Sequence, residues 1–124
     1  MNKALVAFAA LMFTCFGAIG LVDPSRSLAL IHLSAIDTTS INEIRAMYGG
    51  VELGIAAFLF ACLAGRWSLR SGLFVAAALL AGAATGRFVS LFIEGMPVTS
   101  FVGIWLFEAT YAAACVFALM HTDD

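Results

Sequence analysis

The sequence predicts an all-α protein, a four-helix transmembrane bundle, and three observations support this. Hydrophobic residues make up 63% of the chain and charged residues only 11%, against about 25% charged in soluble domains. The mean hydropathy is +1.04. A chain of 124 residues leaves roughly a third of its unfolded surface exposed after folding, and with this composition that surface is apolar. We therefore expect lipid as its solvent.

Four apolar runs have the length of about 20 residues that a helix needs to cross the hydrocarbon core. They predict helices at about residues 4–22, 41–65, 71–93 and 101–120. Two of the three connections are short, which makes consecutive helices antiparallel. We expect an up-down-up-down bundle forming a single domain over residues 1–124.

The first run also resembles the start of a signal peptide, because Lys3 precedes an apolar stretch. A cleaved signal has an apolar region of about 7–15 residues, and this run is longer. The sequence "GAIGLVDPS" at the end of this run contains no good small-x-small cleavage site. We therefore expect the run to be retained as a membrane helix.

The longer connection, about residues 24–36, predicts a short interfacial helix between the first two spans. Asp23 is suited to the N-cap and Pro24 to the first helical position. The stretch "LALIHLSAI" is apolar but too short to span a bilayer, so it is expected to lie at the interface. Beyond it, Ser40 and Glu43 have the spacing of a capping box at the start of the second span.

Orientation follows from basic residues near the helix ends, which favour the cytoplasmic side. Lys3 precedes the first helix, and Arg66 and Arg70 lie in the turn between the second and third. Trp67 in the same turn is a typical interfacial anchor. Both termini are therefore predicted to be cytoplasmic, although Arg26 lies on the opposite side.

Several function classes lack their sequence signals. No block of basic residues is present, so nucleic-acid binding is not expected. Cys15, Cys62 and Cys115 are isolated within apolar runs, without redox or zinc spacing. His32 and His121 lie outside the apolar cores and do not suit haem ligation. We expect no metal and no cofactor.

Four charged residues remain within the spans: Arg45, Glu52, Arg87 and Glu108. A charge at mid-bilayer costs about 2.5–3.5 kcal/mol on insertion scales, so each needs a reason. At 1.5 Å per residue, Glu52 and Glu108 lie roughly 9–10 Å below the outer boundary and Arg87 roughly 6–9 Å. These three ionisable groups are therefore expected in one layer of the outer half of the bundle.

Helical spacing adds neighbours to these charges. Arg45, Tyr48 and Glu52 share one stripe of the second span. An Arg flanked by two carboxylates is a closed unit, because its planar fork binds two partners, so Arg87 is the expected partner of Glu52. Such a cluster either fastens helices together or binds a ligand, a proton or an ion. The candidate cluster is Arg45, Tyr48, Glu52, Arg87, Trp105, Glu108 and Tyr111.

Glycines in the second and third spans predict close helix packing. Gly50 and Gly54 form one G-x-x-x-G pair, Gly82 and Gly86 form another, and Gly49 adjoins the first. Small residues four apart allow helix backbones to approach. Two uses stay open: packing within the chain, or packing on a second copy in a homo-oligomer.

Three stretches, "EIRAMYGGVELGIA", "GRFVSLFIEGMP" and "WLFEATYAAA", resemble the bacterial membrane-protein family catalogued as domain of unknown function 4345. The resemblance runs from about Asn42 to the C-terminus and weakly into the first helix. It implies a four-helix protein of the bacterial inner membrane and implies no activity. The residues that carry it are Arg45, Tyr48, Gly49, Gly50, Gly86, Arg87 and Glu108.

The favoured function is a non-enzymatic module that binds a membrane lipid or a small amphiphile, or an accessory subunit of a larger membrane complex. The alternative is a proton-coupled small-molecule transporter acting as an oligomer, with Glu52 or Glu108 carrying the proton. Small multidrug exporters carry a Glu in their first helix, whereas the first helix here has no charge. An intramembrane enzyme is not expected, because no histidine lies at membrane depth to form a nucleophile–base pair.

Overall fold

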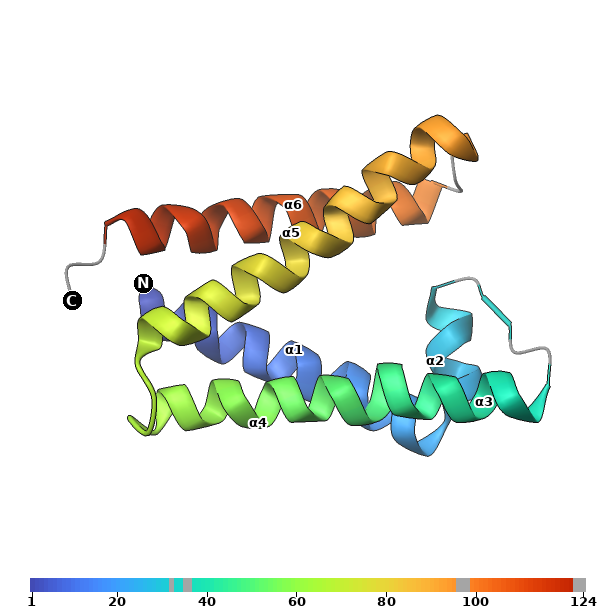
Figure 1. Cartoon of the computed structure of the whole chain (residues 1–124), viewed down its shortest axis with the longest axis horizontal. Helices are drawn as coiled ribbons and strands as arrows, with labels where there is room; N and C mark the ends of the chain where they lie inside the picture. Colours follow the sequence, from blue (N-terminus) through green and yellow to red (C-terminus); the bar gives the residue numbers. More distant parts are fainter. Residues whose placement is uncertain (32, 35–36, 96–98, 122–124) are drawn as a thin grey trace. The chain divides into compact units, whose positions relative to one another are not determined.

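The computed structural model describes residues 1–31, 33–34, 37–95 and 99–121, and their regular structure is entirely helical (Figure 1). The expectations for His32, for the end of the interfacial segment, for the "MP" of the second motif stretch and for the last three residues fall outside this part of the chain. The elements are α1 (Asn2–Val22), α2 (Pro24–Leu30), α3 (Thr38–Ile44), η1 (Arg45–Val51), α4 (Glu52–Leu63), α5 (Leu69–Ile93) and α6 (Thr99–Met120).

Four of the described helical segments are long and apolar enough to cross a membrane. They cover Asn2–Val22, Thr38–Leu63, Leu69–Ile93 and Val102–Met120. The predicted all-α class with four apolar helices is therefore confirmed. With seven residues, α2 is too short to span; its interfacial position and the up-down order of the spans stay predictions.

The contacts of the chain group into two compact units, residues 7–66 and residues 1–6 with 67–124. The first contains most of α1, then α2, α3, η1 and α4. The second contains the start of α1 with α5 and α6, and α5 packs against α6. The buried residues of α5 are mostly small, including Gly72, Ala76, Ala77 and Ala84, which suits close helix packing.

The start of α2 agrees with the sequence. The side chain of Asp23 accepts a hydrogen bond from the Arg26 amide at 3.0 Å, and Pro24 occupies the first turn. Proline is favoured there because its missing N–H would be unpaired in any case. The predicted cap and helix start are confirmed.

The start of α3 differs from the sequence prediction. Asp37 is the N-cap, and its carboxylate accepts from the Ser40 amide at 2.8 Å and from the Ser40 hydroxyl at 2.7 Å. The predicted capping box of Ser40 and Glu43 is therefore wrong, because the carboxylate three residues earlier takes the orphan amide. These bonds hold the pKa of Asp37 below its ordinary value, and the bond from the Ser40 amide has the largest effect.

The chain leaves α4 through a tight turn built on Gly65. This glycine has a φ of 76°, a left-handed conformation that costs glycine nothing. The Arg66 amide donates to the Ala61 carbonyl at 2.9 Å, and the Gly65 amide to the Cys62 carbonyl at 3.1 Å. Together these bonds form a Schellman motif, and Ser68 then caps α5 by accepting from the Ser71 amide.

Candidate functional site

Arg87 of α5 and Glu108 of α6 form a bidentate ion pair. Arg87 Nε donates to Glu108 Oε2 at 2.8 Å, and Nη2 donates to Oε1 at 3.1 Å. The Glu108 residue is only 8% exposed. Two parallel charge-assisted bonds are the strongest geometry for this pair of groups. Both oxygens of Glu108 are thus bound within the chain.

Trp105 makes a second link between the same helices, three residues before Glu108. Its indole Nε1 donates to the backbone carbonyl of Ala84 at 3.0 Å. Its ring stacks on Phe88, with centroids 6.0 Å apart and an interplanar angle of 17°. A buried indole needs one acceptor for its N–H, and the α5 backbone supplies it.

Tyr111 makes a third link, three residues after Glu108. Its hydroxyl donates to the carbonyl of Leu5 in the first turns of α1, and its ring lies 5.7 Å from that of Phe107. In this unit Arg87 therefore pairs with Glu108, and Trp105 and Tyr111 lie about one helical turn before and after Glu108 on α6. Each of these four side chains has a partner within the protein.

The remaining predicted residues lie in the other unit. Arg45 Nε donates to the carbonyl of Leu21, near the end of α1, at 3.3 Å. The Tyr48 residue is 41% exposed. Arg45 therefore satisfies a carbonyl at a helix end, where intrahelical donors are lacking.

Glu52 contrasts with these satisfied groups. Its Oε2 atom is buried and has no hydrogen-bond partner among the described residues. An unsatisfied buried polar atom costs about 1–3 kcal/mol, so its presence in a native structure needs an explanation such as a bound ligand or ion. Arg87, its expected partner, belongs to the other unit and binds Glu108, so the pairing of Glu52 with Arg87 stays a prediction.

A π-helical segment, η1 (Arg45–Val51), joins α3 to α4 and ends directly before Glu52. This segment was not predicted from the sequence. Short π segments inside α-helices are rare and frequently occur at functional sites. The consecutive Gly49 and Gly50 in the middle of an apolar run were the available signal. The Glu52 oxygen that lacks a partner among the described residues thus lies directly after an irregular part of its span.

Close backbone approach in this unit occurs at η1. A Cβ added to Gly20 would lie 2.1 Å from the Tyr48 carbonyl oxygen, and one added to Gly49 would lie 2.9 Å from the Leu21 amide. Only residues without a side chain permit this crossing of α1 and η1. Gly20 was not predicted as a packing residue, although the small residues of "GAIG" in the first run were an available signal.

The G-x-x-x-G pairs do not make such contacts among the described residues. A Cβ at Gly54, Gly82 or Gly86 would meet no atom within 4 Å, and one at Gly50 would meet only the Arg45 carbonyl at 3.9 Å. Their predicted role in close packing within the chain therefore stays a prediction. Their use by a second copy stays a prediction.

Four helices of this length and apolarity define a multi-pass membrane protein. The chain belongs to the family described as Domain of unknown function (DUF4345), whose model matches residues 1–119. The resemblance seen in the sequence is confirmed, and the match also covers α1. No curated protein and no solved structure matches the chain.

Proposed function

We propose that this chain is a non-enzymatic module of the bacterial inner membrane that binds the polar head of a lipid or small amphiphile through Glu52. The observation that carries the proposal is the buried Glu52 Oε2, which has no hydrogen-bond partner among the described residues. Both termini are placed in the cytoplasm, in line with Lys3, Arg66 and Arg70 near that side.

The two span carboxylates differ in what they offer a ligand. Both oxygens of Glu108 accept hydrogen bonds from Arg87, so a ligand that binds Glu108 would have to break a strong bidentate pair. Oε2 of Glu52 can accept a hydrogen bond from a ligand without breaking any bond among the described residues. The ion pair and the indole bond between α5 and α6 therefore stabilise the protein, and Glu52 accepts the hydrogen bond from the ligand.

The chemistry of Glu52 favours a ligand with donor groups. An ionised carboxylate only accepts hydrogen bonds, so a complementary head carries an ammonium or a hydroxyl. Two apolar residues that precede Glu52 in the chain are exposed: Met47 is 54% and Val51 48% exposed. Flexible Met side chains adapt to varied apolar groups. An amphiphile with an amine head and an alkyl tail matches both features.

The alternative is a proton-coupled transporter acting as an oligomer. A membrane carboxylate without a protein partner suits a proton carrier, so the same atom supports this reading. The two candidates differ in outcome: transport requires a flux driven by a pH gradient in proteoliposomes, and the loss of that flux in Glu52→Gln. Binding without such a flux supports the module.

The direct test measures how amphiphiles change the thermal unfolding of the purified full chain in detergent. A ligand that binds the folded state raises the melting temperature. We expect dodecylamine to raise it for the wild type and for Glu94→Gln, a matched control at the exposed end of α5. Glu52→Gln should lose most of the increase. An equal increase in Glu52→Gln and the wild type contradicts the proposal.

A further inference from the structure

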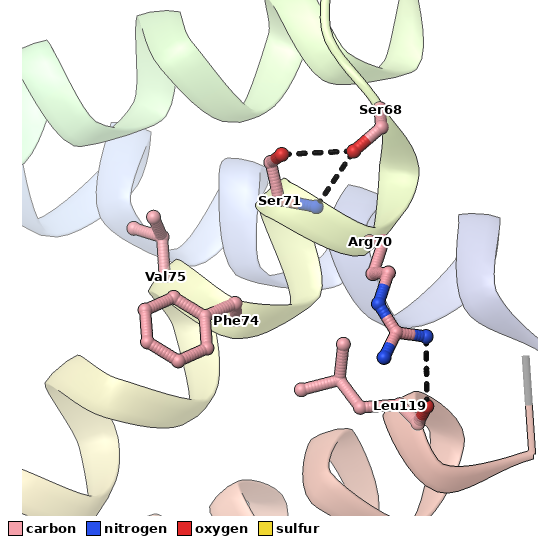
Figure 2. A pocket seen from close by; sticks show the side chains of 6 residues that line it. All are labelled: Ser68, Arg70, Ser71, Phe74, Val75 and Leu119. Carbon is pink, nitrogen blue, oxygen red and sulfur yellow. Dashed lines mark hydrogen bonds between the residues drawn. The ribbon is translucent and has the colours of Figure 1, made fainter. Parts of the chain in front are cut away.

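A pocket of about 380 Å³ lies beside the first turns of α5 and the last turn of α6, within one unit of the chain (Figure 2). Pockets that hold small ligands usually measure about 300–1,000 Å³. Six residues line this one, half of them polar and half apolar: Ser68, Arg70, Ser71, Phe74, Val75 and Leu119. We propose that it binds the phosphate headgroup of an anionic lipid.

The polar side of the pocket favours an anion. The hydroxyls of Ser68 and Ser71 are hydrogen bonded at 2.8 Å, and Arg70 Nη1 donates to the Leu119 carbonyl at 3.2 Å (Figure 2). Among the described residues, the lining contains one guanidinium and no carboxylate. The Ser71 amide already donates to Ser68, so the attraction rests on the Arg70 charge and the hydroxyls rather than on the helix end.

The apolar side of the pocket distinguishes a lipid from a free phosphate. Phe74 is 64% exposed, and it follows Arg70 by about one helical turn in the direction of the span. A phosphate beside Arg70 thus leaves an acyl chain free to run along Phe74 and Val75. Inorganic phosphate has no group for this wall. Basic side chains at the cytoplasmic boundary also attract anionic lipids in general.

The test is native mass spectrometry of the full chain in detergent, titrated with dioleoylphosphatidylglycerol or with dioleoylphosphatidylcholine as the zwitterionic control. We expect the wild type to bind phosphatidylglycerol more tightly. Arg70→Gln should weaken this binding about tenfold, the size of one lost charge-assisted contact. Arg66→Gln removes an exposed arginine of the preceding turn that does not line the pocket, and it should bind as the wild type does.

A second variant keeps the test decisive if Arg70→Gln folds poorly. Ser71→Glu completes a capping box with Ser68, which stabilises α5, while it adds a negative charge to the pocket. It should remain folded and lose phosphatidylglycerol binding. Unchanged binding in this variant overturns the proposal, as does an equal loss in Arg66→Gln. Displacement of the lipid by millimolar inorganic phosphate assigns the pocket to a free anion and also overturns it.

Discussion

Glu108 and Glu52 are the same residue type within two apolar spans, yet their surroundings differ. Both oxygens of Glu108 are bound by Arg87 at 2.8 and 3.1 Å. Oε2 of Glu52 is buried with no hydrogen-bond partner in the described chain. The cost of a charge in an apolar span is thus offset within the protein in one case and left unmet in the other. The difference separates a structural carboxylate from a candidate binding group.

The difference has a local origin. Arg87 and Glu108 lie on α5 and α6, which follow one another and pack together, so their pair forms between neighbours in sequence and space. Arg45, the arginine closest in sequence to Glu52, instead binds the Leu21 carbonyl across the crossing at Gly20 and Gly49. The Nε donor of Arg45 therefore binds a backbone carbonyl of α1.

Arg87→Ala breaks the comparison most strongly, because it leaves the buried Glu108 carboxylate without its partner. Removing one member of a buried pair costs about 3–5 kcal/mol. Unfolding by SDS in mixed micelles, followed by circular dichroism, measures this loss. Arg87→Lys keeps the charge without the planar fork and should lose less. A change below about 1 kcal/mol, typical of an exposed pair, contradicts a structural role.

Gly20→Ala tests the crossing that precedes Glu52. The new Cβ would lie 2.1 Å from the Tyr48 carbonyl oxygen, so backbone must shift, at a cost of about 1–3 kcal/mol. Gly54→Ala is the matched control, since its Cβ meets nothing within 4 Å and alanine favours a helix by up to about 1 kcal/mol. Thermal unfolding of both variants measures the contrast, and equal melting temperatures would argue against the crossing.

Trp105→Phe sharpens the comparison, because it weakens the contact between α5 and α6 next to Glu108 and leaves the ion pair in place. It removes the bond to the Ala84 carbonyl, present at 3.0 Å, and keeps a ring against Phe88. One such bond contributes about 1 kcal/mol. SDS unfolding measures the loss. Trp105→Leu also removes the stacked ring and should cost more. An unchanged stability in Trp105→Phe would contradict a contribution from the indole bond.

The smallest effect concerns Asp37, which caps the span that carries Glu52. Bonds from the Ser40 amide and hydroxyl lower its pKa from 3.8, because they favour the ionised form. The stability from this cap is therefore complete above the ordinary pKa and is lost as the pH falls through the lowered value. NMR chemical shifts of α3 should show its first turn fraying in acid. Asp37→Asn should remove this pH dependence, and fraying that persists in it assigns the effect to another group.

The sequence predicted the fold class well, because apolar runs of spanning length leave little choice but helices. It also predicted the Asp23 cap, where local chemistry decides. The sequence pattern placed the cap of α3 at Ser40. This was wrong, because two possible caps compete there and the stronger acceptor is the carboxylate of Asp37. The π segment and the crossing at Gly20 depend on packing between helices, which spacing within one run does not contain.

The candidate site was predictable only in part. Depth and facing selected Arg87, Glu52 and Glu108 as costly charges, since each stands in an apolar run. They favoured Arg87 as the partner of Glu52, but depth could not separate the two carboxylates, because both were expected at similar depth. Because α5 packs on α6, Arg87 pairs with Glu108. The pocket beside Arg70 was not foreseen, because Arg70 was interpreted only as a marker of orientation.

The most direct test compares Glu52→Met with Glu108→Met in the unfolding free energy of the ligand-free chain in detergent. Methionine replaces each carboxylate by an apolar group of similar volume. Glu52→Met should raise stability by about 1 kcal/mol or more, because it removes an unsatisfied polar atom. Glu108→Met should lower it by about 3–5 kcal/mol, because Arg87 loses its carboxylate. Opposite signs support distinct roles, and a loss of similar size in both variants would contradict them.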